Sequence, residues 1–160
     1  MSEALKDKAQ RSLYETDFAS WLDYTAQLLR EKRFHDVDLD HLIEEIEALS
    51  RRDKREIRSR LIVLLLHLLK YRYQPQNLSQ SWLQTIVEQR RQLDLILEDS
   101  PSLKNYMSEV FAACYLKART EAAQETQLDI AVLPDVCPFT QVETLDSDWL
   151  PRQNLRRHDD

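Results

Sequence analysis

Apolar residues recur every three or four positions along most of the first 128 residues, which is the period of an amphipathic helix. Thr16 or Asp17 can cap a helix that runs to about Arg33, and Asp38 can cap the next one. We expect each of these helices to bury its apolar stripe against the rest of the fold. The second stripe comprises Leu39, Leu42, Ile43, Ile46 and Leu49.

A third helix is predicted from about residue 53 to Tyr73, because Asp53 with Glu56 fits a capping box and Pro75 follows. Residues 61–69 are apolar on nearly every face, which indicates the central helix of the fold. One straight helix over residues 39–73 would be about 52 Å long, against a globule diameter of roughly 40 Å. The pattern therefore favours a break near residues 50–54, with a kinked or protruding continuous helix as the alternative.

Two further helices are bounded by serine and proline. The fourth is expected from Ser79 or Gln80 to before Ser100, and the fifth starts with Ser100 as cap and Pro101 at its first position and ends near Thr126. Beyond residue 128 the period is lost, and three prolines punctuate a segment that still carries apolar residues. We predict an all-α bundle of about five helices in one domain over residues 1–150, with a core at 14–128, an irregular strap at 129–150 packed on it, and a flexible tail at 151–160.

Composition narrows the possible functions. The chain has no glycine, where average usage of about 7% would give roughly eleven, so phosphate-binding loops, dinucleotide turns and nucleophile elbows are excluded and no cofactor is expected. The N-terminal residues lack the pattern of a secretory signal, and no apolar run is long enough to span a bilayer. Two cysteines without a metal-binding motif are expected to be reduced thiols, which favours a cytoplasmic, soluble protein without a membrane partner.

A series of short motifs resembles the family catalogued as domain of unknown function 29. The resemblance lies in the order and spacing of the motifs, and no single motif is specific. The resemblance extends from about Tyr14 to Pro151. It implies a small all-helical domain, and it implies no established activity. The motifs are Tyr14-Glu15, Asp17-Phe18, Trp21, the run Leu42 to Glu47, His67 to Lys70, Ser81-Trp82, Asp99 to Leu103, Tyr115, Ala118-Arg119, Glu125-Thr126 and Cys137-Pro138.

His67 is the first candidate for chemistry, because an imidazole among leucines is expected to be partly buried and must then find a polar partner. Glu44, Glu45 or Glu47 can supply that partner, as an acid-base pair or half of a metal site. The competing interpretation, which we favour, is a structural polar contact that fixes the helix register.

A calcium loop is the second candidate. Counting Asp36 as position 1 places carboxylates of Asp36, Asp38, Asp40 and Glu47 at positions 1, 3, 5 and 12. Position 6 falls on His41, where the loop needs glycine, and the helical stripe has already begun there. Asp38 is therefore better explained as a helix cap, and no metal is expected.

A basic segment is the third candidate. Residues 51–72 hold eight Lys or Arg and two acidic residues, a local charge of +6 in a chain whose formal net charge is −6. Glu47 with Arg51 and Glu56 with Arg60 have the i, i+4 spacing of a solvated salt-bridged face. The remaining cations can hold an acidic protein or phosphates. The candidate partner-binding residues are Arg51, Arg52, Lys54, Arg55, Arg58 and Arg60.

These features favour a small cytosolic interaction or regulatory module without catalytic activity, whose partner is a protein. The alternative is a metal-dependent hydrolase or acid-base enzyme centred on His67 with Glu44, Glu45 and Glu47. Nucleic-acid binding through residues 51–72 comes third, because the acidic balance of the chain disfavours it. The sequence leaves a homo-oligomer open.

Overall fold

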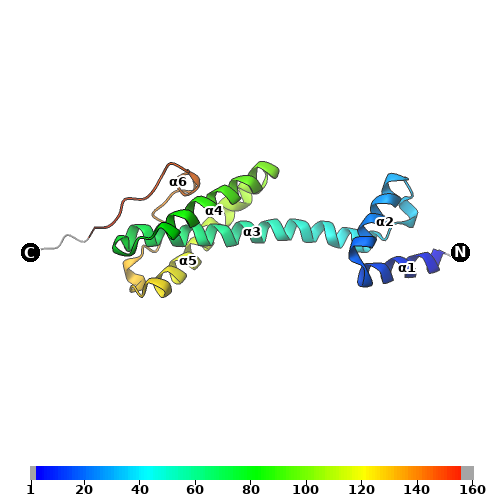
Figure 1. Ribbon diagram of the computed structural model, residues 1–160, viewed down its shortest axis with the longest axis horizontal. Helices are drawn as coiled ribbons and strands as arrows, with labels where there is room; N and C mark the ends of the chain where they lie inside the picture. The colour runs from blue at the N-terminus through cyan, green and yellow to red at the C-terminus, as the bar shows by residue number, and fades with distance from the viewer. Residues whose placement is uncertain (1–2, 156–160) are drawn as a thin grey trace, which may run out of the picture. The chain divides into compact units, whose positions relative to one another are not determined.

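The computed structural model of the protein describes residues 3–155, and within them all regular secondary structure is helical (Figure 1). This confirms the predicted all-α class. The helices are α1 (Glu3–Thr16), α2 (Phe18–Arg30), α3 (Leu39–Tyr73), α4 (Gln80–Asp99), α5 (Leu103–Thr126) and α6 (Gln141–Leu145), and the short 3-10 helices are η1 (Phe34–Asp36), η2 (Pro75–Asn77) and η3 (Ile130–Val132).

The chain forms two compact units, Met1–Arg52 (unit 1) and Asp53–Asp160 (unit 2). The helix α3 continues from unit 1 into unit 2 without a break at residues 50–54, where the sequence favoured one. Residues 39–73 contain neither glycine nor proline, so no residue type in this stretch interrupts the backbone hydrogen bonds of the helix. Glu56 does not close a capping box, since its Oε1 accepts a hydrogen bond from Arg60 Nε at 2.8 Å. The sequence analysis favoured a break because it compared the length of the helix with the diameter of a single globule, whereas the chain forms two compact units.

Unit 1 is held by polar contacts and by a small group of buried apolar and aromatic side chains. Asp17 caps α2, as predicted, with its Oδ1 accepting the backbone N–H of Ser20 at 3.0 Å. The helix α1, which the sequence pattern missed, is tied to the start of α3 because Gln10 Oε1 accepts the backbone N–H of Asp38 at 3.0 Å. The buried apolar side chains of this unit include Trp21, Leu28 and Val37.

One apolar stripe of α3 is not buried. The sequence predicted that Leu39, Leu42, Ile43, Ile46 and Leu49 face the core. Leu42 is half-buried, but the exposed fractions of the other four side chains are 55%, 53%, 58% and 53% in chain order. The neighbouring face of α3 is the one that packs, because the ring of Tyr14 from α1 stacks on His41 with centroids 3.9 Å apart. The prediction that this stripe is buried is wrong. The helical spacing of the apolar residues located an apolar face of α3, but it did not show whether another part of the chain covers that face.

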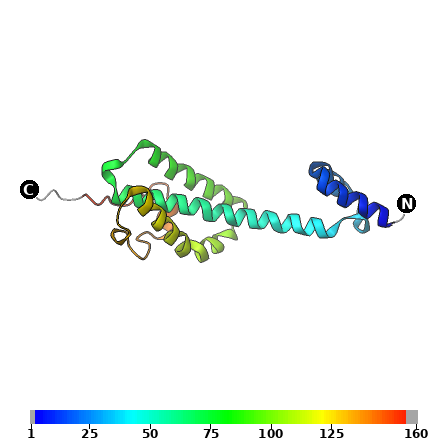
Figure 2. The same cartoon turned by 90° about the horizontal axis from the view of Figure 1, so that it is seen from below.

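Unit 2 has an extensive apolar core. In Figures 1 and 2, α4 and α5 lie along the second part of α3. Leucines, isoleucines and small residues of these helices pack around it. The α3 residues Leu61, Leu64, Leu65, Leu68 and Leu69 are fully buried, as the apolar run predicted. Met107, Cys114 and Ala118 form the buried face of α5.

The strap at residues 129–150 packs on this core, as predicted. Leu133 and Phe139 are buried, and Trp149 packs edge-on against Phe139 with ring centroids 5.6 Å apart. Buried cations and hydroxyls bind its carbonyls: Arg90 Nε donates to Thr144 O at 2.9 Å, and Tyr115 donates to Pro134 O. The irregular pattern of the strap did not predict its two short helices, η3 and α6. The helix α6 opens with a Thr140–Glu143 capping box.

The predicted tail at 151–160 is only partly described. Pro151 is buried, and the backbone N–H of Asn154 donates to the carbonyl of Arg72 at 2.7 Å. Residues 156–160 lie outside the described residues. None of the helices within residues 3–155 combines the length and the apolar character needed to cross a bilayer.

Candidate functional site

A groove between α3 and α5 in unit 2 gathers part of the predicted basic segment. It encloses about 430 Å³. Arg55, Arg58 and Ser59 line it from α3, and Lys117 lines it from α5. The remaining lining residues are Ile62, Val110, Ala113 and Cys114. Three cationic side chains therefore surround a largely apolar floor, and none of the lining residues carries a carboxylate.

The three cations that line this groove, unlike Arg51 and Arg60 of α3, have no ion-pair partner among the described residues. Arg51 pairs with Glu47 at 3.7 Å and Arg60 pairs with Glu56 at 2.8 Å, as the i, i+4 spacing predicted. Among the described residues, no carboxylate lies within ion-pair distance of Arg55, Arg58 or Lys117. The groove thus presents unneutralised positive charge.

The other predicted basic residues lie outside the groove. Arg52 is exposed at the end of unit 1, and Lys54 places its Nζ over the Tyr106 ring, 5.3 Å from the centroid. Of the six predicted cations, only Arg55 and Arg58 line the groove. The structure brings Arg55 and Arg58 together with a lysine from another helix.

Cys114 lies at the floor of the groove and is a free cysteine, as expected. Burial raises the pKa of its thiol, and the nearby charges of Arg58 and Lys117, which act in the opposite direction, do not offset burial. A raised pKa disfavours the thiolate, which is the nucleophilic form. The Cys114 thiol is therefore a poor nucleophile at this position.

His67 does not form the predicted pair with a glutamate. Its Nδ1 lies 2.8 Å from the carbonyl oxygen of Val63, one turn earlier, and burial lowers its pKa. Glu47 precedes His67 by 20 residues on the same helix, which corresponds to about 30 Å of helix, and Glu44 and Glu45 lie further away still. The predicted acid-base pair with a glutamate is therefore wrong, and the polar contact of His67 is made within α3 itself.

The three glutamates have other surroundings in unit 1. Glu45 Oε1 accepts a hydrogen bond from the Tyr14 hydroxyl at 2.6 Å, which raises the pKa of Tyr14 to about 12. Glu47 pairs with Arg51, and Glu44 is exposed. The contact of Glu45 fastens α1 to α3.

The aspartates of the candidate calcium loop are used as helix caps and ion pairs. Asp38 caps α3, with its Oδ1 3.4 Å from the backbone N of His41 and its Oδ2 2.6 Å from His41 Nδ1. Asp36 pairs with Arg33 at 2.8 Å, and Asp40 is exposed. Within residues 3–155 no three metal-binding side chains converge.

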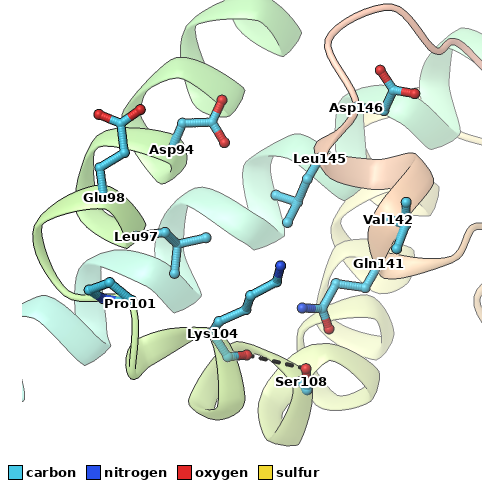
Figure 3. Close-up of a pocket in the computed structure, with 10 residues that line it drawn as sticks. All are labelled: Asp94, Leu97, Glu98, Pro101, Lys104, Ser108, Gln141, Val142, Leu145 and Asp146. Atoms are coloured by element: carbon cyan, nitrogen blue, oxygen red, sulfur yellow. Dashed lines mark hydrogen bonds between the residues drawn. The ribbon is translucent and has the colours of Figure 1, made fainter.

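A second, wider cavity of about 820 Å³ lies between the end of α4, the start of α5 and α6 (Figure 3). The Lys104 side chain extends into it, whereas Asp94 and Glu98 stand on its α4 side and Asp146 on its α6 side. These carboxylates give it the opposite charge to the groove. The sequence analysis did not find this cavity, because α6 itself was not predicted.

The sequence analysis also missed Lys117, the groove cation on α5. Arg58 and Lys117 are separated by 58 intervening residues, so no local motif connects them. In the sequence, Lys117 appears only as a single lysine beside the apolar face of a helix. Such lysines are common in amphipathic helices, so its position does not mark it as part of a site.

The comparisons with known proteins identify a family and no function. Neither the curated proteins nor the solved structures contain a match to the chain. A comparison with protein families matches residues 13–150, nearly the whole chain, to the family described as "Domain of unknown function DUF29". This agrees with the order of motifs from Tyr14 to Cys137-Pro138. The chain therefore belongs to the DUF29 family.

Proposed function

We propose that this protein is a non-catalytic interaction module whose α3–α5 groove binds an acidic segment of a partner protein. One observation carries the proposal: Arg55, Arg58 and Lys117 surround an apolar floor and have no carboxylate of their own in the described chain. Such a groove suits a helix or extended segment with carboxylates at its edges and one or two aliphatic side chains between them.

A protein partner is favoured over a nucleic acid. The formal net charge of −6 opposes binding to a polyanion, and a nucleic-acid backbone with its many phosphates is usually held by more than three cations. The groove also lacks an aromatic lining residue on which a base can stack. An acidic peptide needs only a local cluster of cations and an apolar contact.

The test uses the full chain and a fluorescent helical peptide of alternating glutamate and leucine pairs, with binding measured by anisotropy. We expect saturable binding that weakens as salt rises. The double variant Arg55→Glu with Arg58→Glu is expected to weaken binding by roughly tenfold or more, because each reversal replaces attraction by repulsion.

The matched control carries the same change in charge away from the groove, Lys104→Glu with Arg152→Glu. It is expected to bind the peptide nearly as the original chain does, because both residues lie outside the groove. Equal loss in both double variants would show that net charge alone matters and would contradict the proposal. Tighter, salt-sensitive binding of DNA or RNA would favour the nucleic-acid alternative instead.

We also propose a cytosolic location for this module. Its two cysteines are free, which suits a reducing compartment. Cell fractionation with an antibody to the protein measures this directly, and recovery from a membrane or an oxidising compartment would refute it.

A further inference from the structure

The cavity between α4, α5 and α6 is wider than the α3–α5 groove, and the proposed function does not use it. Its volume of about 820 Å³ lies within the range of protein ligand sites, which is roughly 300–1,000 Å³. Helix α4 lines one side and α6 another, and the start of α5 lies between them (Figure 3). Aliphatic side chains from α4, from the turn before α5 and from α6 line it: Leu97, Pro101, Val142 and Leu145.

The charged residues of this cavity are mainly acidic. Asp94 and Glu98 stand on its α4 side and Asp146 on its α6 side, whereas Lys104 extends into it from α5 (Figure 3). The lining therefore holds three carboxylates and one ammonium, a net charge of −2. Among the described residues, none of these carboxylates lies within ion-pair distance of a cation. They are thus available to a cationic ligand.

One buried cation reduces this negative charge without removing it. Arg90 is only 3% exposed, and its guanidinium donates to the carbonyl of Thr144 at 2.9 Å and to that of Glu143 at 3.4 Å. It also attracts Asp94 and Asp146, so it offsets part of their charge. Three carboxylates still stand against two cations. The segments that border the cavity, residues 94–109 and 141–150, together contain seven carboxylates and one lysine, so the surroundings are acidic as well.

The arrangement of these groups indicates which ligand complements the cavity. The carboxylates stand on opposite sides of an aliphatic surface, so a ligand with separated cations and aliphatic groups between them matches both features. None of the lining residues is aromatic, so they do not form the cage that typically binds a quaternary ammonium. A peptide segment with lysines or arginines spaced by leucines or valines supplies both the charge and the apolar surface.

We propose that this cavity binds a basic, partly apolar segment of a partner protein. The carboxylates on its two sides pair with the cations of the segment, and the aliphatic lining covers its apolar side chains. Lys104 repels such a segment and therefore limits its affinity. The cavity is separate from the α3–α5 groove and has the opposite charge, so unit 2 can hold a basic and an acidic segment at different places.

The first experiment measures binding of a fluorescent peptide of alternating lysine and leucine pairs to the full chain by anisotropy. We expect saturable binding that weakens as salt rises. The variant Asp94→Lys with Glu98→Lys is expected to bind roughly tenfold more weakly or worse, because each reversal replaces attraction by repulsion. The matched control, Asp23→Lys with Glu44→Lys, makes the same change in charge in unit 1 and should bind nearly as the original chain does. All four residues are exposed, so both variants should keep their helical circular dichroism.

The second experiment tests the two other parts of the cavity. Lys104→Gln removes the one cation of the lining and is expected to strengthen binding of the lysine–leucine peptide several-fold. Val142→Ser removes apolar surface from a side chain that is 79% exposed, and it should weaken binding a few-fold without affecting the fold. The matched control Val136→Ser changes a valine of the strap that is 80% exposed and lies outside the cavity, and it should leave binding unchanged.

Four results would overturn the proposal. They are an absence of saturable binding, equal losses in the two charge-reversal variants, weaker binding by Lys104→Gln, and equal losses in the two valine variants. Spermidine at the concentration of the peptide should not displace it, and displacement would assign the cavity to a small polyamine instead. The glutamate–leucine peptide, measured on the same variants, reports on the groove alone. It should not be weakened by Asp94→Lys with Glu98→Lys, so failure at one site leaves the test of the other intact.

Discussion

Residues 39–49 and residues 57–69 of α3 both carry aliphatic side chains at helical spacing, yet their surroundings differ. In the second stretch Ile57 and Leu61 are fully buried, because α4, α5 and the strap all belong to unit 2 and close around the helix. In the first stretch Ile43 and Ile46 are more than half exposed, since α1 contacts a neighbouring face through polar side chains. The difference teaches that an apolar stripe predicts where a helix needs a partner and does not predict that its own chain provides one.

The largest expected effect, and the strongest test of this comparison, is the loss of stability when a buried side chain of unit 2 is truncated. We expect Leu61→Ala to lower the free energy of unfolding by roughly 2–5 kcal/mol, because the side chain is fully buried and its neighbours cannot close the gap. Urea unfolding followed by circular dichroism measures this. The control Leu116→Ala, at 52% exposure, is expected to change the free energy by less than about 0.5 kcal/mol. Equal losses in the two variants would mean that burial does not decide stability in unit 2.

A smaller effect is expected from the polar contacts of unit 1. Asp38→Ala removes the cap of α3 and the partner of His41, and should cost unit 1 roughly 1 kcal/mol. Asp38→Asn keeps a side-chain acceptor and should cost less. Fluorescence of Trp21 in a chain with Trp82→Phe and Trp149→Phe follows unit 1 selectively during urea unfolding. An alanine variant as stable as the asparagine one would show that the cap contributes nothing.

The smallest effect is a pH dependence in unit 2. Burial lowers the pKa of His67 from its ordinary 6.5, so between the lowered pKa and pH 6.5 the unfolded chain binds a proton that the folded chain does not. The free energy of unfolding should therefore be highest above pH 6.5, fall as the pH drops through 6.5, and level off below the lowered pKa. His67→Gln should flatten this slope, and His35→Gln, a change at an exposed histidine of unit 1, should leave it unchanged. Equal slopes in all three proteins would exclude a contribution from His67.

Local signals predicted much of the fold. Asp17 and Pro101 marked the beginnings of α2 and α5 to within two residues, because caps and prolines act on adjacent backbone. The helix α1 was missed, since it is mostly polar and is held by Gln10 and Tyr14 contacts that no periodicity reveals. The continuity of α3 was underestimated, because chain length says nothing about how many compact units form.

The candidate groove was only half predictable. Arg55 and Arg58 stand out in sequence as part of a dense basic run, whereas Lys117 joins them only when α5 packs on α3. The same limit applies to His67, whose expected partner was a glutamate and whose actual partner is the carbonyl of Val63. In both cases the residue type was identified locally, and the contact depended on tertiary packing.

The shared helix α3 also affects the order in which the chain acquires structure. Starting a helix is unfavourable, since several residues are fixed for one hydrogen bond, whereas each later residue adds a bond at a lower entropic cost. Once residues 39–52 are helical in unit 1, the backbone of residues 53–73 extends an existing end and avoids a new start. A helix that forms first in either unit thereby offers an existing end from which the rest of α3 can grow.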